Sequence, residues 1–223
     1  MLGSQYYRLV RYLVSALVFI DGNNLYHNLK ASGVTPSDID LAKLSSYACD
    51  HFSAVAKRTH YYNSVPSMEL GQEKYLKHRD FIEDIKRLPN FEVKTRKLQK
   101  QSNGRRIAEK LGRVNQTGYC KNCVHLAEEE CKSCVGDFSM KEKGIDVMIA
   151  IDMLNLCAVE NECEMCILIS GDADFIPALD IIRAKGKKVA SAFIFHGYSA
   201  ELRQKHEFFC MDMDHLKDKC ARS

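Results

Sequence analysis

The sequence predicts a three-layer α/β/α fold with a central, mostly parallel sheet. Two short, largely apolar runs, residues 14–20 and 165–169, have the composition of strands that are buried on both faces. Segments with strand-like and helical patterns alternate along most of the chain, which is typical of a parallel sheet with helices on both sides. The length of 223 residues fits one α/β domain that carries one substantial insertion.

The individual elements follow from periodicity and from their end signals. The predicted strands cover residues 14–20, 57–64, 91–98, 165–169, 189–195 and 207–211. The predicted helices cover residues 25–30, 37–52, 69–88, 145–159, 174–184 and 199–206. Ser37 or Asp38 is placed to cap the second helix, the third helix ends before Pro89, and Gly186 follows the fifth.

Residues 99–140 interrupt this alternation because they are polar, basic and rich in cysteine. We treat them as an insertion within a single domain that spans residues 1–223. The apolar residues 9–20 are too few to cross a bilayer and include Arg11, so we read them as the approach to a buried strand. No membrane partner is expected. Ten cysteines without secretory features favour a reducing, cytoplasmic location.

The net charge of +3 does not by itself indicate a nucleic-acid partner, but the distribution of charge is uneven. Residues 94–113 carry eight basic side chains and one acidic one. A local basic block attracts polyanions even in a nearly neutral chain, although a solvated surface segment has the same composition. The candidate nucleic-acid-binding residues are Lys94, Arg96, Lys97, Lys100, Arg105, Arg106, Lys110 and Arg113.

Aspartates follow two of the buried strands where each strand ends. Asp21 comes directly after residues 14–20, and Asp172 and Asp174 come shortly after residues 165–169. Ligands of open parallel sheets bind outside the carboxyl ends of the strands, so these carboxylates are expected to face one crevice. Gly22 and Gly171 permit tight turns and close backbone approach at the same places.

A third contributor is the apolar helix predicted over residues 145–159. Asp146 and Asp152 are its acidic residues, and a buried carboxylate is costly unless it is paired, hydrogen-bonded or bound to a metal. Asp146 lies in the first turn, where the helix dipole favours an anion. Asp152 is six residues further along and faces another direction, so it is placed at the margin of the site in a supporting role.

Carboxylates gathered in this way repel one another, by about 4 kcal/mol for two charges 4 Å apart at an effective dielectric of 20. A hard divalent cation such as Mg²⁺ or Mn²⁺ relieves the repulsion and prefers oxygen ligands. Such an ion can activate water and stabilise charge on a phosphodiester, which predicts phosphodiester hydrolysis. The alternative for each aspartate is a simple helix cap, and Asp174 could cap a helix that starts at Phe175.

Three motifs also carry a family resemblance. FIDGNN, KGIDVMIAIDM and SGDADFIPAL, in that order, resemble the NYN domain of the PIN-like nuclease superfamily, and within it the LabA-like (DUF88) group. The resemblance covers residues 14–98 and 141–211. It implies a PIN-like fold and a Mg²⁺- or Mn²⁺-dependent ribonuclease activity.

The same resemblance assigns roles to individual residues. It implies catalytic roles for Asp21, Asp146, Asp172 and Asp174, and the first three are expected to bind the metal. Asn24 and Ser170 fall in the same motifs, and they would support the site by hydrogen bonds to phosphate or to water on the metal. Some relatives are thought to bind RNA or nucleotides without strong cleavage.

The insertion contains two Cys-x₂-Cys pairs, which predict a structural zinc site. Four thiolates suit a tetrahedral Zn²⁺ ion that orders a segment too polar to form its own core, whereas four free thiols are the alternative. His125 could replace one ligand. The zinc ligands are expected to be Cys120, Cys123, Cys131 and Cys134.

The leading hypothesis is a metal-dependent endoribonuclease that cleaves single-stranded RNA, with single-stranded DNA left open as a substrate and a homodimer left open as the assembly. Tyr61, Tyr62 and Tyr119 are candidates for stacking on unpaired bases, although packing within the protein is the alternative for each. Two other functions fit the same residues. One is a PIN-like module that binds RNA or a protein partner and cleaves nothing, and the other is a phosphatase that acts on small phosphorylated substrates.

Overall fold

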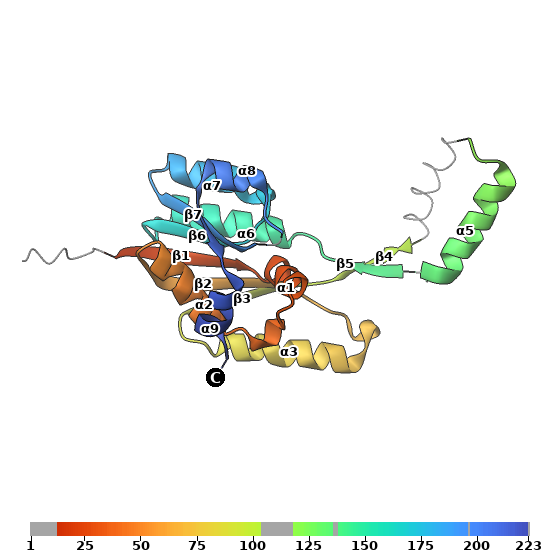
Figure 1. Cartoon of the computed structure of the whole chain (residues 1–223), viewed down its shortest axis with the longest axis horizontal. Helices are drawn as coiled ribbons and strands as arrows, with labels where there is room; N and C mark the ends of the chain where they lie inside the picture. Colours follow the sequence, from red (N-terminus) through yellow and green to blue (C-terminus); the bar gives the residue numbers. More distant parts are fainter. Residues whose placement is uncertain (1–12, 104–117, 136–137, 196, 223) are drawn as a thin grey trace, which may run out of the picture.

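A six-stranded parallel sheet forms the centre of the molecule (Figure 1). The structure is a computed structural model that describes residues 13–103, 118–135, 138–195 and 197–222. The strand order is β3-β2-β1-β6-β7-β8. The strands are β1 (Val14–Asp21), β2 (Ala54–Val65), β3 (Phe91–Lys97), β6 (Met165–Ile169), β7 (Lys188–Ile194) and β8 (Glu207–Met211).

The strand β1 is buried on both faces, as its largely apolar run predicts. Its side chains alternate between the two faces of the sheet because the period of a strand is two residues. Val18 and Ile20 belong to the core on one face, and Leu17 and Phe19 belong to the core on the other. β1 therefore contributes side chains to both hydrophobic cores.

Four helices cover one face of the sheet, below it in Figure 1. Their buried residues Leu29, Leu44, Ile85 and Leu216 pack into a single apolar cluster with β1. Two short 3₁₀ turns, Pro36–Asp38 and Met68–Leu70, lie between the longer elements. The helices are α1 (Gly22–Ala31), α2 (Leu41–His51), α3 (Gln72–Lys86) and α9 (Met213–Cys220).

The opposite face is covered by a second group of helices. Ile145, Ile149, Met153 and Cys157 recur every four residues and are fully buried, so one stripe of this helical segment packs on the sheet. The group comprises α6 (Ile145–Met153) with the π-helical turn Leu154–Val159, the 3₁₀ turn Ala173–Phe175, α7 (Ile176–Ala184) and α8 (Ala200–Lys205). The predicted three-layer α/β/α fold is confirmed.

Local details differ from the sequence prediction near the ends of elements. Asp40, rather than Ser37 or Asp38, caps α2 by accepting hydrogen bonds from the backbone of Ala42 and Lys43. Residues 36–38 instead form their own 3₁₀ turn, which ends before the Asp40 cap of α2. The helix α9 has no counterpart in the prediction.

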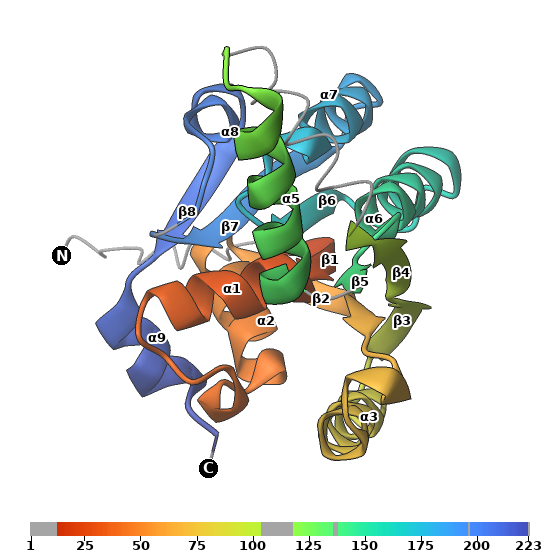
Figure 2. The same ribbon diagram turned by 90° about the vertical axis from the view of Figure 1, so that its right-hand side faces the viewer.

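The described residues between positions 99 and 141 form a separate arm. The strand β4 (Gln99–Ser102) pairs antiparallel with β5 (Phe138–Lys141), and this ribbon carries the helix α5 (Lys121–Val135). The arm projects beyond the carboxyl ends of the central strands (Figure 1). Figure 2 looks onto that end of the molecule, where α1, α6 and the arm face the viewer.

The described residues do not show the two predicted zinc knuckles, which stay a prediction, and α5 runs without a break from Lys121 to Val135. Cys123 and Cys131 are eight residues apart in α5, which separates them by about 12 Å along the axis. Thiolates on one zinc ion lie only about 4 Å from each other, given a Zn–S distance of about 2.3 Å. The thiols of Cys120 and Cys123 are exposed and 3.3 Å apart, whereas the side chains of Cys131 and Cys134 lie outside the described residues.

The two sides of α6 provide a stability test with a matched control. Ile149 is fully buried against the sheet, and Ile151 on the same helix is 58% exposed. We expect Ile149→Ala to lower the free energy of unfolding by roughly 2 to 5 kcal/mol because it leaves a core cavity. Ile151→Ala should change it by less than about 0.5 kcal/mol. Urea unfolding of both variants measures the difference, and equal losses would contradict the orientation of α6.

Candidate active site

The acidic motifs meet where two neighbouring strands end. β1 pairs with β6, and Ile20 lies opposite Ile169 at the last step of this pairing. Asp21 and the loop that contains Asp172 therefore leave the sheet side by side. Asp146 lies in the first turn of α6 and reaches the same edge. A pocket of about 310 Å³ is lined by these three carboxylates together with polar residues of α1 and of the segment before α6.

Hydrogen bonds at the ends of the strands fix two of the carboxylates. Asp21 caps α1, with its Oδ1 accepting from the Asn24 backbone N–H at 3.0 Å. Asp172 caps the following 3₁₀ turn, with its Oδ1 accepting from the Asp174 backbone N–H at 3.0 Å. Each cap engages one carboxylate oxygen. The capping and metal-binding interpretations of the sequence are therefore compatible.

Asn24 and Ser170 connect the two loops. The Ser170 hydroxyl donates to Asp21 Oδ2 at 3.2 Å and accepts from the Asp172 backbone N–H at 3.3 Å. Asn24 Oδ1 accepts from the Gly171 backbone N–H at 3.1 Å and from Asn28 Nδ2 at 2.9 Å. These contacts fix the segments that carry Asp21 and Asp172 relative to each other.

Gly171 is needed because the backbone passes very close to it. A Cβ atom at this position would collide with the carbonyl oxygen of Gly197 and lie 2.8 Å from the Tyr198 Cα. This close contact packs the loop after β6 against the segment that precedes α8. The same segment hydrogen-bonds back, since the Ser199 N–H donates to the Gly171 carbonyl at 2.8 Å.

The pocket concentrates negative charge where water is partly excluded. Asp21 is 3% exposed, and burial raises its pKa to about 6, with the charges of Asp146 and Glu142 adding to the effect. The Asn24 and Ser170 hydrogen bonds act in the opposite direction. Burial also raises the pKa of Asp146, and the charges of Asp172 and Asp174 raise it further. A divalent cation would stabilise all of these carboxylates in their ionised form.

Glu142 and His27 line the same pocket, and the sequence prediction missed both of them. Burial raises the pKa of Glu142, and so does the charge of Asp146, whereas Ser64 and His27 nearby lower it. Glu142 directly follows β5 and lies outside the acidic motifs on which the sequence prediction rests. His27 could have been found from spacing, because it lies three residues after Asn24 on one face of α1.

Asp152 and Asp174 lie away from the centre of the pocket. Asp152 accepts hydrogen bonds from the Tyr62 hydroxyl and from Lys94 Nζ, both at 2.7 Å, and it is not among the pocket residues. Its charge is therefore balanced by Lys94 on β3. Asp174 is exposed and does not line the pocket, although its charge acts on Asp146.

The basic residues of this block have different structural surroundings. Lys94 pairs with Asp152, and Lys100 pairs with Glu69 at 3.3 Å. Arg96 reaches the site, since its Nη1 donates to the Gly144 carbonyl at 3.4 Å, and Gly144 lines the pocket. Lys97 is exposed at the end of β3. The remaining predicted contacts lie outside the described residues and are Arg105, Arg106, Lys110 and Arg113.

Two of the three predicted stacking residues are buried. Tyr61 is 3% exposed and Tyr62 is fully buried, so their rings pack inside the protein and offer no face to a base. Both follow the period of β2, with Tyr61 in one core and Tyr62 in the other. Tyr119 on the arm is 61% exposed.

Comparison with known proteins identifies the family. The family model of the NYN domain matches residues 15–212. The chain belongs to the NYN domain family. The NYN domain is a branch of the PIN-like nuclease superfamily, so membership indicates a nuclease-type function related to RNA. Assignment to the LabA-like group stays a prediction.

A solved structure supports the same fold. The NYN chain resembles the crystal structure of a protein of unknown function from Vibrio parahaemolyticus RIMD 2210633, with a TM-score of 0.53 and 16% identity. The match covers 96% of this chain and 98% of the other. At this identity the likeness concerns the fold alone. No curated protein matches the chain.

Among the described residues, no three His, Cys, Asp or Glu side chains lie close enough together to form a metal-binding group. No helix in the described ranges is long and apolar enough to cross a membrane.

The burial of Asp21 predicts an unusual pH dependence of stability in metal-free protein. The pKa of Asp21 is higher in the folded state than its ordinary value of 3.8, so the folded protein binds the carboxyl proton more tightly than the unfolded chain does. Stability should therefore fall as pH rises from about 4 to 6, by at most about 3 kcal/mol. Asp21→Asn removes this loss, so the variant should be more stable than wild type at pH 7.5 in EDTA and similar to it near pH 4.

Urea unfolding at the two pH values measures this effect. Asp84→Asn is the control, because Asp84 is exposed on α3 and faces no other carboxylate of the site. Saturating Mn²⁺ should stabilise wild type more than Asp21→Asn. A destabilised Asp21→Asn variant at pH 7.5 in EDTA would contradict the cost assigned to the buried carboxylate.

Proposed function

We propose that this NYN domain is a Mg²⁺- or Mn²⁺-dependent endoribonuclease that hydrolyses phosphodiester bonds in single-stranded RNA. The observation that carries the proposal is the shared pocket of Asp21, Asp146 and Asp172 at the carboxyl ends of β1 and β6. Burial raises the pKa values of Asp21 and Asp146, and neighbouring carboxylates raise them further, as is common for acids in functional sites.

The oxygen-rich donor set fits a hard divalent cation. Asp21, Asp146 and Asp172 would hold the ion, and Glu142 adds a fourth carboxylate to the pocket wall. When bound, the cation supplies Lewis-acid chemistry, which favours attack of water on the phosphodiester and neutralises the charge that develops. Asp174 supports the site through its charge on Asp146.

The surrounding residues orient these carboxylates and the substrate. Ser170 and Asn24 hold the two loops so that Asp21 and Asp172 face the same space. Arg96 lies beside Gly144 at the pocket wall, where its guanidinium can contact a phosphate of the bound strand. A single strand suits the site because its flexible backbone can bend into a pocket of about 310 Å³.

Replacing the metal-binding carboxylates tests the mechanism. We expect Asp21→Asn and Asp146→Asn each to lower the rate of RNA cleavage with Mn²⁺ on the order of a hundredfold or more. The reason is that each removes one charge from the cation site while keeping the shape of the side chain. The measurement is cleavage of end-labelled single-stranded RNA and DNA, with EDTA as the metal-free reference and Asp84→Asn as the matched control.

Three results would contradict the proposal. Cleavage at the wild-type rate by either variant would show that these carboxylates do not carry the reaction. Tight RNA binding by wild type without cleavage in Mg²⁺ or Mn²⁺ would favour a binding module. Turnover of p-nitrophenyl phosphate without turnover of RNA would instead favour a phosphatase.

A further inference from the structure

An exposed aromatic residue lies on α1 beside the acidic pocket. Tyr26 is 44% exposed, and the next residue, His27, is exposed and lines the pocket. Their ring centroids are 5.5 Å apart, with the ring planes nearly perpendicular at 88°. Tyr26 has no place in either hydrophobic core. The edge of the site therefore presents an aromatic surface to solvent.

A basic side chain lies next to this aromatic surface. Lys30 lies one helical turn after Tyr26, and its Nζ is 5.5 Å from the centre of the tyrosine ring. Exposed aromatic rings together with basic side chains are the features with which proteins bind single-stranded nucleic acids, since bases stack on the rings and cations contact the backbone. Tyr26, His27 and Lys30 bring both features to the same stretch of α1.

We propose that Tyr26 is the stacking platform for one unpaired nucleobase next to the cleavage pocket, with His27 at the edge of that base and Lys30 contacting its phosphate. This inference rests on the proposed function, because it names how the same site holds its substrate. A base on Tyr26 places its nucleotide beside His27, and His27 lines the pocket of Asp21 and Asp146. The neighbouring phosphate then enters the pocket. A base-paired strand has no free face to offer, so the subsite selects unpaired RNA.

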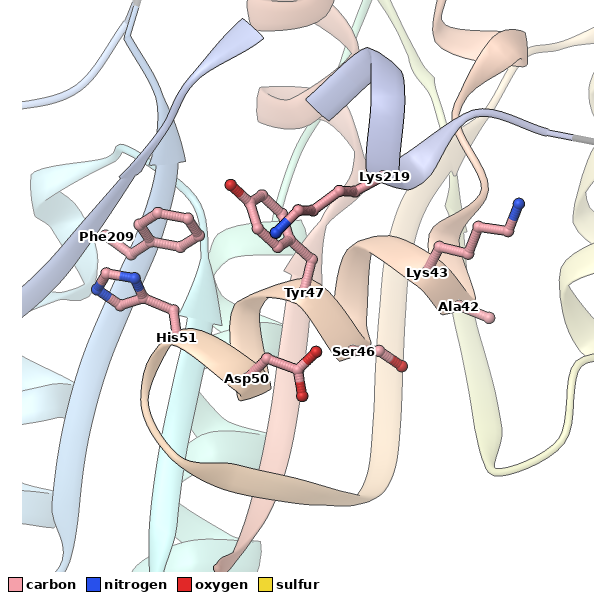
Figure 3. A pocket seen from close by; sticks show the side chains of 8 residues that line it. All are labelled: Ala42, Lys43, Ser46, Tyr47, Asp50, His51, Phe209 and Lys219. Carbon is pink, nitrogen blue, oxygen red and sulfur yellow. The ribbon is translucent and has the colours of Figure 1, made fainter. Parts of the chain in front are cut away.

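A second hollow also combines aromatic and basic residues, but it lies away from the acidic pocket. It has a volume of about 640 Å³ and lies between α2, β8 and α9 (Figure 3). His51 stacks on Phe209 with ring centroids 3.8 Å apart, and Lys219 lies 5.0 Å from the Tyr47 ring centre. His51 ends α2 just before β2 begins, so this hollow is remote from the carboxyl ends of the strands.

The two hollows supply matched variants for a binding experiment. Short single-stranded RNA that carries 2-aminopurine reports stacking by fluorescence quenching, and EDTA prevents cleavage during the measurement. We expect Tyr26→Leu to weaken binding about tenfold and to abolish the quenching, because stacking on one aromatic ring is lost. Tyr26→Phe keeps the ring and should retain both. Tyr47→Leu removes a tyrosine that also has a lysine over its ring, and it should change neither.

An abasic oligonucleotide identifies the base that is involved. Removing the stacked base should weaken binding to wild type about as much as Tyr26→Leu does. The same removal should have little further effect on Tyr26→Leu, because the two changes delete one interaction. Removal of bases at other positions should affect both proteins equally.

The outcomes separate this proposal from the nuclease proposal. Unchanged binding and quenching in Tyr26→Leu, in a protein that cleaves RNA with Mn²⁺, would overturn the subsite and leave the nuclease intact. Loss of quenching with Tyr47→Leu alone would also overturn it and place the base in the second hollow. Stacking on Tyr26 without any cleavage would support the subsite and contradict the nuclease. A wild-type protein that binds no oligonucleotide would overturn both.

Discussion

The carboxylate of Asp21 is buried at the end of the central strand, and this burial shapes the rest of the site. β1 lies between β2 and β6 and packs helices on both faces, so its last residue has little access to water. Ionising Asp21 there is costly, and the hydrogen bonds from Asn24 and Ser170 offset only part of the cost, since its pKa remains raised to about 6. Asp146 and Glu142 add further negative charge. Under the proposed function a divalent cation would offset this charge, and the close approach at Gly171 helps to keep the loops in position.

The sequence alone predicts the parts of the molecule that depend on local pattern. The largely apolar run of residues 14–20 predicts a strand buried on both faces, and the structure confirms it. The parallel order of strands brings the residues after β1 and β6 to one edge, which is why Asp21 and Asp172 line one pocket. These inferences succeed because the period of a strand and the topology of a parallel sheet leave few alternatives.

Features that depend on contacts between distant segments could not be predicted in this way. Lys94 belongs to a basic block by sequence, yet it pairs with Asp152 across the sheet surface. Tyr62 has the composition of a stacking residue, but the period of β2 directs it into the core. Two Cys-x₂-Cys pairs predict zinc knuckles, and three of their four cysteines lie within the continuous helix α5. Tyr26, in contrast, becomes a candidate only once the exposed side of α1 is known.

The most direct test of the central claim is a crystal structure of the wild-type protein with Mn²⁺, in which anomalous scattering locates the ion. We expect one or more anomalous peaks within coordination distance of Asp21, Asp146 and Asp172, at about 2.0 to 2.3 Å from their oxygens. The carboxylates should have moved together relative to the metal-free pocket. An ion bound elsewhere in crystals saturated with Mn²⁺, with these three side chains unliganded, would contradict the claim that the pocket is a divalent-cation site.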